Sequence, residues 1–377
     1  MDQMEIRQLV ARQRAYFQSG ATLPARARVE ALRALRSAVA AREEELNDAL
    51  RADLGKSAFE SYMCEVGMVL SELTYMIRRT PAFAADRRVR TPLAQFAARS
   101  YVKPSPYGTV LIMSPWNYPL LLTLDPLIDA LAAGNTAVVK PSAYSPATSR
   151  VIARLLAECF PPEHVSVVTG GRQENACLLE QKFDYIFFTG SQAVGREVLL
   201  HAAQYLTPVT LELGGKSPCI IDKSANLKLT AKRLAFGKYL NCGQTCVAPD
   251  YVLVHEAVKE EFLKLLKSEI RAMYGEDPLK NPDYGKMINR KHFDRVLGLM
   301  KEEKLILGGE NDTASLRIAP AVMDQVTEDD AVMQEEIFGP LLPILTVGSM
   351  EEAIAFVNRR PKPLALYLFT ENRETEK

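Results

Sequence analysis

A cysteine and a glutamate on separate turns are the residues of this chain best suited to chemistry. Cys246 ends the segment NCGQTC (241–246), where it follows a glycine, an amide and a hydroxyl residue. Glu212 lies in LELGGK (211–216), at the end of an apolar run. A thiolate is a strong nucleophile, and a carboxylate can accept a proton from water or thiol. The two residues therefore predict covalent catalysis with a separate general base.

Each of these residues also has a purely structural interpretation. Many cysteines are buried packing residues, although nearby backbone amides and a helix terminus would favour a thiolate at Cys246. Glu212 is either a buried base, whose pKa burial would raise toward neutral, or a solvent-exposed carboxylate at a strand end. We expect Cys242 to pack in the core, and a redox partnership with Cys246 is the alternative.

Three further motifs carry polar groups at the ends of apolar runs. Asn117, in PWNYP, could donate to an oxyanion or simply anchor a loop. Gly190 and Ser191 open a helix after a strand, so their amides could bind phosphate; a close-packed turn explains the motif equally well. The spacing G-S-x-x-x-G differs from the dinucleotide fingerprint G-x-G-x-x-G. Lys140 could bind ribose or phosphate, or could be a solvated strand end.

A last motif, EEIFGP (335–340), places Glu336 and Phe338 before a tight turn. The structural alternative is an acidic loop with Phe338 packed in the core.

Composition excludes several other functions. Of 377 residues, 47% are apolar and 24% charged, and Lys+Arg and Asp+Glu both number 46. Zero net charge and no basic aromatic stripe argue against nucleic-acid binding. No apolar run reaches the roughly 18 residues of a membrane helix, and the N-terminus has no signal-peptide core. Six scattered cysteines and four histidines without ligand spacing predict neither a disulfide framework nor a metal site. We expect a cytoplasmic protein.

The order of apolar runs predicts an α/β protein with two domains. Helices dominate residues 1–86, and the basic, proline-broken stretch 87–106 is expected to be a bridging or oligomerisation arm. Five short β-rich runs alternate with helices over 107–211, which indicates a Rossmann-like parallel sheet covered on both faces. Ligands bind such sheets at the carboxyl ends of the strands. A second α/β domain, of residues 212–377, is expected to be catalytic.

Six motifs stand here in an order that resembles the aldehyde dehydrogenase superfamily: PWNYP, VVKPS, FFTGS…VG, LELGGKSP, GQTC and EEIFGP. WNYPL, FDYIFFTGS, TCVAPDYVL and the short N-terminus are most similar to its class 3 branch. That branch oxidises fatty, medium-chain and aromatic aldehydes with NAD or NADP, usually as homodimers.

The resemblance implies a role for each matching residue. Cys246 would attack the aldehyde, Asn117 would hold the oxyanion, and Glu212 would activate the water that hydrolyses the thioester. Glu336 would bind the nicotinamide ribose with Phe338 near the ring, and Lys140 would bind the adenosine ribose. The other implied cofactor contacts are Trp116, Ser142, Gly170, Thr189, Gly190, Ser191, Val194 and Leu213.

Two departures from the family pattern carry expectations. Ala143 stands where many relatives have a glutamate that grips the adenosine ribose, so we expect NADP to be tolerated. Family members usually continue for roughly 70–80 residues beyond the position of Lys377. A chain ending there is expected to show weak or no activity and a defective dimer.

Three other functions remain open at this point. A coenzyme A-acylating enzyme would pass the thioester to a thiol, although Glu212 as water-activating base argues against it. A non-catalytic protein on the same scaffold would fit a truncated chain. A thiol-redox protein would use Cys242 and Cys246.

Overall fold

The computed structural model describes residues 1–377 as two compact units. Unit 1 contains Met1–Asp53 and Ala58–Glu212, and unit 2 contains Leu54–Ser57 and Leu213–Lys377. The short segment 54–57 belongs to unit 2, where the Leu54 carbonyl accepts a hydrogen bond from the Lys286 N–H at 2.9 Å. No motif or shift in composition predicts that residues 54–57 belong to unit 2 while the residues on either side belong to unit 1. No helix is both long enough and apolar enough to cross a bilayer.

Unit 1 is built on a five-stranded sheet in the order β5-β4-β3-β6-β7. Its strands are β3 (Thr109–Met113), β4 (Thr136–Lys140), β5 (Val165–Val167), β6 (Tyr185–Gly190) and β7 (Val209–Leu213). The pairs of β3 with β4, β3 with β6 and β4 with β5 are parallel. Every residue of β3 and β4 is buried, as expected of central strands covered on both faces.

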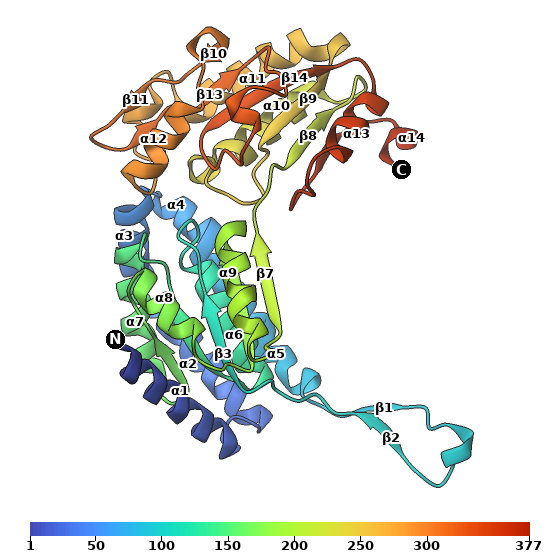
Figure 1. The fold of residues 1–377 in the computed structure, drawn as a ribbon. Helices are drawn as coiled ribbons and strands as arrows, with labels where there is room; N and C mark the ends of the chain where they lie inside the picture. The colour runs from blue at the N-terminus through green and yellow to red at the C-terminus, as the bar shows by residue number, and fades with distance from the viewer. The chain divides into compact units, whose positions relative to one another are not determined.

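The helices of unit 1 cover this sheet in two sets (Figure 1). In the first set, α6 and α7 pack on the strands, and α2 and α5 pack on these helices. In the second set, α1 and α9 pack on the strands, and α8 contacts both of them. Their bounds are α1 (Gln3–Gln18), α2 (Ala25–Ala41), α3 (Glu43–Leu54), α4 (Ala58–Ser61), the π-helix η1 (Tyr62–Val66), α5 (Gly67–Phe83), α6 (Leu121–Ala133), α7 (Pro146–Cys159), α8 (Arg172–Leu179) and α9 (Gln192–Ala203).

Within the predicted helical region 1–86, residues 25–54 form two helices, α2 and α3. Arg42 leaves the helical conformation at φ −117°, and α3 restarts with three glutamates, 43–45. Acidic residues in a first turn favour a helix N-terminus because they oppose the helix dipole.

The predicted arm is an antiparallel hairpin, β1 (Arg87–Val89) with β2 (Ser100–Val102), around a short 3-10 turn, Leu93–Gln95. It extends away from the helices and sheet of unit 1 (Figure 1). Leu93 and Phe96 at its tip are 89% and 84% exposed.

Unit 2 holds a six-stranded sheet in the order β10-β13-β14-β9-β8-β15. Neighbours from β13 to β15 pair in parallel, and β10 joins β13 antiparallel. The strands are β8 (Pro218–Ile221), β9 (Tyr251–His255), β10 (Leu305–Leu307), β13 (Ala321–Met323), β14 (Leu341–Val347) and β15 (Tyr367–Phe369), with a small hairpin of β11 (Asn311–Asp312) and β12 (Arg317–Ile318). The three-residue strand β13 was not predicted from the sequence.

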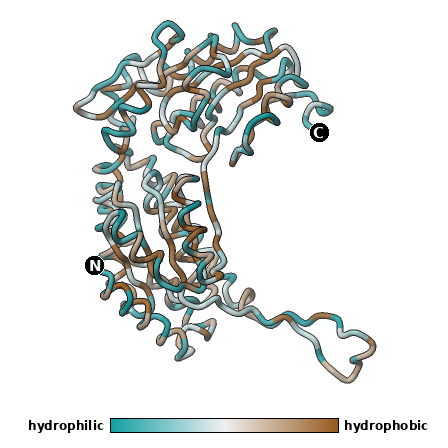
Figure 2. Tube along the Cα trace, viewed as in Figure 1, coloured by the Kyte–Doolittle hydropathy of each residue, from teal (hydrophilic) through white to brown (hydrophobic).

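Alternate residues of these strands enter two separate cores. Tyr251 and Leu253 of β9 belong to one cluster, and Val252 and Val254 to the other. Figure 2 shows apolar residues along the strands of both units. The helices of unit 2 are α10 (Leu227–Tyr239), α11 (Lys259–Tyr274), α12 (Arg290–Gly298), α13 (Met350–Asn358) and α14 (Arg373–Glu376), with the 3-10 turns η3 (Leu240–Gly243), η4 (Glu256–Val258), η5 (Pro278–Lys280), η6 (Glu302–Lys304) and η7 (Ala331–Met333).

Candidate active site

In unit 1 the predicted site residues lie at the carboxyl ends of the parallel strands. Asn117 follows β3, Lys140 ends β4, Gly170 follows β5, and Thr189 and Gly190 end β6. The strand registers put Met113 beside Lys140 and beside Phe188, so these ends lie along one edge of the sheet. Trp116 and Ser142 are half-buried in the loops after β3 and β4. This is the edge at which parallel sheets bind their ligands.

The loop that carries Asn117 is fixed by a carboxylate that sequence reasoning missed. Glu65, fully buried on the π-helix η1, accepts hydrogen bonds from the N–H groups of Leu120 (2.8 Å) and Leu121 (3.2 Å). It therefore satisfies amides at the start of α6, directly after buried Asn117. A glutamate among the apolar residues 63–70 was the available signal, and single-turn π-helices are frequent at functional sites.

Lys140 is buried, which rules out the solvated strand end considered as its alternative. Its Nζ donates to the carbonyls of Pro141 (2.9 Å) and Gly170 (2.8 Å). Burial lowers the Lys140 pKa to about 8, and Glu174 opposes that shift. Gly170 has φ +133°, and a Cβ there would overlap the Glu174 carboxylate. The ammonium group is thus held with one donor to spare at the edge of the sheet.

The motif after β6 opens a helix of 12 residues. Ser191 is the N-cap of α9, and its Oγ accepts from the Val194 N–H at 3.4 Å. Both residues are exposed. A Cβ at Gly190 would lie 2.7 Å from the Phe188 ring, so close packing requires this glycine. The turn therefore combines both interpretations: it is tightly packed, and its helix N-terminus is open to an anion.

Glu212 is the exposed residue of β7. The buried environment considered for it is not observed, and the residue fits the alternative of a carboxylate at a strand end open to water. Leu213, half-buried, ends the same strand.

In unit 2 the cysteine follows a run of unusual backbone. Asn241, Cys242 and Gly243 have φ of 51°, 53° and 71°, in the left-handed region that non-glycine residues rarely adopt. Reciprocal amide bonds fix the run, because Asn241 Nδ2 donates to the Gln244 carbonyl (3.1 Å) and Gln244 Nε2 donates to the Asn241 carbonyl (3.0 Å). Gln244 Oε1 also accepts from the Ile288 N–H at 3.0 Å. Local strain held by such over-determined contacts is typical of functional sites.

The two cysteines of this segment have different surroundings. Cys242 is 1% exposed and belongs to a hydrophobic core, in agreement with the expected packing role. Cys246 is partly exposed. A helix terminus was expected to favour the thiolate form of Cys246. The helix before the cysteine, α10, instead ends at Tyr239, and a helix C-terminus carries partial negative charge, which does not favour a thiolate.

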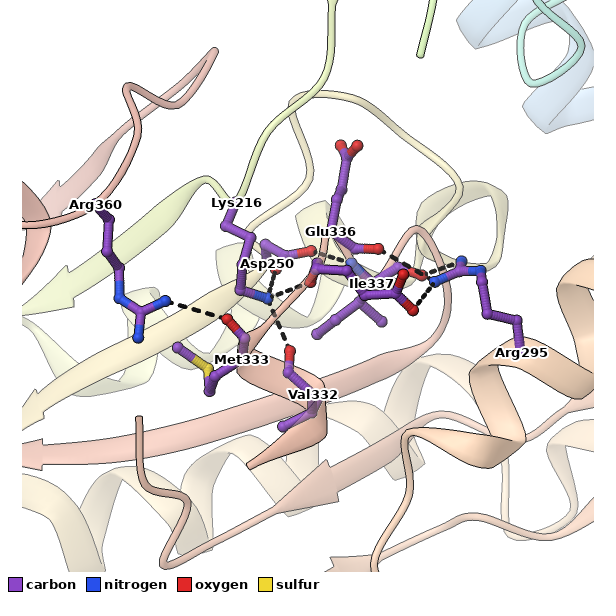
Figure 3. A network of polar contacts seen from close by, with 9 residues as sticks. Lys216, Asp250, Arg295, Val332, Met333, Glu336, Ile337 and Arg360 are labelled. Atoms are coloured by element: carbon purple, nitrogen blue, oxygen red, sulfur yellow. Dashed lines mark hydrogen bonds and ion pairs between the residues drawn. The ribbon is translucent and has the colours of Figure 1, made fainter. Parts of the chain in front are cut away.

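Glu336 and Phe338 lie in the segment between η7 and β14. A Cβ at Gly214 would overlap the Glu336 carboxylate, which also accepts a hydrogen bond from the Gly215 N–H. Burial raises the Glu336 pKa to about 7. Phe338 has φ 47° and is half-exposed, so it does not pack in the core. Figure 3 shows the Glu336 side chain pointing away from the contacts that hold its backbone.

Comparison with known proteins gives the family. The aldehyde dehydrogenase family model matches residues 1–377. A curated relative from Staphylococcus aureus, 4,4'-diaponeurosporen-aldehyde dehydrogenase, is 46% identical over 361 residues, which are 95% of this chain and 79% of the relative. A dimeric, NADP-preferring aldehyde dehydrogenase from Canis lupus familiaris is 45% identical over 98% of this chain and 81% of its own length. This chain belongs to the aldehyde dehydrogenase family.

A solved structure agrees. The substrate-bound state of an aldehyde dehydrogenase from Staphylococcus aureus is similar with a TM-score of 0.98 and 44% identity, over 100% of this chain and 82% of that one. The resemblance drawn from six motifs is therefore confirmed, and so is the α/β fold with a Rossmann-like sheet. The chain is an oxidoreductase that oxidises aldehydes to carboxylic acids.

Proposed function

We propose that this aldehyde dehydrogenase uses Cys246 as nucleophile, Asn117 as oxyanion donor and Glu212 as the base that activates water. The strained segment before Cys246 is the observation that carries the proposal, because a left-handed run fixed by buried amides is the kind of local strain that is typical of functional sites. An exposed Glu212 at a strand end is accessible to water, as a hydrolytic base must be.

The reaction needs an acceptor for hydride, and a bound NAD or NADP supplies that chemistry. The residues of each unit fit such a dinucleotide. In unit 1 the buried Lys140 ammonium suits a ribose hydroxyl or phosphate, and the open N-terminus of α9 at Ser191 suits a phosphate. In unit 2 the Glu336 carboxylate over Gly214 suits ribose hydroxyls.

The residues of the chain then act in sequence. The Cys246 thiolate adds to the carbonyl carbon, and the Asn117 amide stabilises the oxyanion of the resulting thiohemiacetal. Loss of hydride to the acceptor leaves a thioester on Cys246. Glu212 takes a proton from water, and the hydroxide displaces the thiolate and releases the acid.

We propose a medium- or long-chain aliphatic or an aromatic aldehyde as substrate, in line with the class 3 resemblance and with the aldehyde named for the Staphylococcus aureus relative. NADP is accepted beside NAD, because exposed Ala143 places no carboxylate near a 2′-phosphate. A preference for NAD above roughly 100-fold contradicts this part of the proposal.

We further propose a cytoplasmic homodimer. The support for a dimer is the projecting hairpin of unit 1, whose Leu93 and Phe96 are almost fully exposed (Figure 1). For a protein of the length of its relatives, the expected result is a mass of two chains by light scattering, reduced to one by deleting residues 87–106.

A burst experiment separates the catalytic roles. With excess aldehyde and NAD, Cys246→Ala should form no NADH, and Glu212→Gln should form about one NADH per chain and then stall at the thioester. Cys159→Ser, at a half-buried thiol in unit 1, is the matched control and should turn over normally. Steady turnover by Glu212→Gln contradicts its role as base. Acyl-coenzyme A as the product, formed only with added coenzyme A, would instead establish the acylating reaction.

A further inference from the structure

A buried ion pair in unit 2 joins two residues to which the reaction assigns no role. Lys216 Nζ contacts the Asp250 carboxylate, and the side chains are 13% and 5% exposed. Lys216 precedes β8 and Asp250 precedes β9, and these strands are parallel neighbours with Pro218 beside Tyr251. The Asp250 N–H donates to the Ser217 carbonyl at 2.8 Å, so a hydrogen bond also joins the residues that directly precede β8 and β9.

Both members of the pair also bind the backbone of residues 332–337. Lys216 Nζ donates to the carbonyls of Val332 and Glu335, each at 2.8 Å. Asp250 Oδ1 accepts from the Ile337 N–H at 2.9 Å. Figure 3 shows the pair reaching this segment from β8 and β9.

The opposite side of the same segment is held from α12. Arg295 donates to the carbonyls of Glu336 (3.2 Å) and Ile337 (2.5 Å). Residues 334–340, between η7 and β14, form no helix or strand. Hydrogen bonds from these side chains therefore help to fix the conformation of a segment that has no regular secondary structure.

We propose that Lys216 and Asp250 are a positioning pair that fixes residues 332–337 so that Glu336 presents its carboxylate to the nicotinamide ribose. The proposal rests on the cofactor role given to Glu336 above. In this role the pair acts through the backbone on either side of Glu336.

The charges make the pair a unit. Removing either partner leaves the other charge buried without its counter-ion, which is strongly unfavourable. Lys238, 1% exposed in α10, feels both members and Glu336, and burial lowers its pKa to about 8. Loss of one charge therefore disturbs a cluster of two lysines and two carboxylates around the Glu336 segment.

The first test compares cofactor affinity with chemistry at the thiol. In Asp250→Asn and Lys216→Met we expect the NADH dissociation constant, measured by fluorescence, and the KM for NAD to rise about 10-fold or more. Hydrolysis of an activated ester such as p-nitrophenyl acetate needs Cys246 but no hydride acceptor, so it should stay within about 2-fold of wild type. Lys216→Arg keeps the charge and should recover part of the affinity lost in Lys216→Met.

The control is a second ion pair of unit 2, whose side chains are mostly covered. Lys259 and Asp324 lie 2.8 Å apart and are 15% and 14% exposed, and Asp324 likewise accepts a backbone N–H, that of Gln325. Asp324→Asn should leave NADH affinity unchanged. Equal losses of affinity in Asp324→Asn and Asp250→Asn would show a general effect of buried charge and would overturn the proposal.

A double-variant cycle tests whether the pair acts through Glu336. If it does, Asp250→Asn should weaken NADH binding much less in a Glu336→Gln background than in wild type. Additive losses, or unchanged affinity in both single variants of the pair, overturn the proposal. Failure of the proposed function is a distinct result: the wild-type protein would then bind NADH and oxidise no aldehyde, and the cycle could still be read from binding alone.

Discussion

Each unit has its own sheet, and the reactive groups lie at the carboxyl edge of the parallel strands in unit 1 but at their amino edge in unit 2. In unit 1 the polar residues follow the strands: Asn117 after β3, Lys140 at the end of β4 and Thr189 at the end of β6. In unit 2 they precede them: Cys246 comes before β9 and Glu336 before β14. Strands β8, β9 and β14 are parallel, so these residues lie toward the amino edge of their sheet.

The two edges offer different physical support. At a carboxyl edge, helices begin, and their free N–H groups can bind anions directly, as at Ser191 before α9. At an amino edge, helices end, as α10 does before the cysteine segment, and no such donors are available. Unit 2 instead uses left-handed backbone at 241–243 and long side chains that bind loop carbonyls. A site at an amino edge must be fixed by tertiary contacts.

The substitution with the largest expected effect disrupts the contact between the loop before Cys246 and the loop after Glu336, both in unit 2. In Gly243→Ala the new Cβ would overlap the Gly339 carbonyl, and the residue would keep φ +71°. Overpacking against backbone together with an unfavourable φ should cost about 3–4 kcal/mol, and kcat should fall at least 100-fold. Urea unfolding and steady-state kinetics measure both effects.

The control for that prediction is another glycine of the same unit. A Cβ added at Gly298, at the end of α12, would meet no atom within 4 Å, so Gly298→Ala should be neutral or stabilise by up to about 1 kcal/mol. Normal activity in Gly243→Ala would show that the cysteine loop tolerates displacement and would remove the contrast between the two edges.

The next prediction concerns the effect of pH on stability through Glu336, a carboxylate of unit 2 whose pKa is raised by burial. The Glu336 pKa, raised by burial to about 7, exceeds the value of about 4.5 in the unfolded chain. The group therefore favours folding below pH 4.5, and that contribution is lost as pH rises through 7. Glu336→Gln does not titrate, so its stability relative to wild type should improve by ~2 kcal/mol between pH 5 and pH 8.

Urea midpoints of the two proteins at both pH values check this expectation. Glu310→Gln, at an exposed glutamate of unit 2, measures the general effect of removing one carboxylate. A difference in stability between Glu336→Gln and wild type that is the same at pH 5 and pH 8 would falsify the raised pKa of Glu336 and its cause in burial.

The same contrast explains which features could be predicted from the sequence. The alternation of apolar runs with helices predicted unit 1 and the residues at its strand ends, because a parallel sheet brings successive strand ends together. Cys246 was proposed from its thiol and the Gly-Gln-Thr before it, and the cofactor role of Glu336 was proposed from the resemblance in motif order. Glu65, Lys216, Asp250 and Arg295 were missed because each acts on backbone far away in sequence. Asp250, for example, binds the N–H of a residue 87 positions later, and no local pattern encodes that contact.

A smaller effect sharpens the description of unit 1. Lys140→Met removes the ammonium but keeps most of the buried volume, so we expect the KM for NADP to rise about 10-fold, or ~1.4 kcal/mol. In wild type, NADP affinity should also fall above pH 8, where Lys140 loses its charge. Lys182→Met, at an exposed lysine of the same unit, is the control for a general loss of positive charge. Unchanged KM values would mean that Lys140 only ties β4 to Gly170.

The smallest effect tests whether helix termini in unit 1 support the fold without tuning the site. Asp53 accepts hydrogen bonds from the N–H groups of Ala147 (3.1 Å) and Thr148 (2.8 Å) at the start of α7. Asp53→Ala should therefore cost about 1 kcal/mol of stability, as the loss of a helix cap does. The KM for NAD should not change, since α7 begins after the Lys140 loop and is held by its own buried face. A rise in KM as large as that in Asp250→Asn would show that the start of α7, like the Asn117 loop held by Glu65, helps to shape the cofactor edge of unit 1.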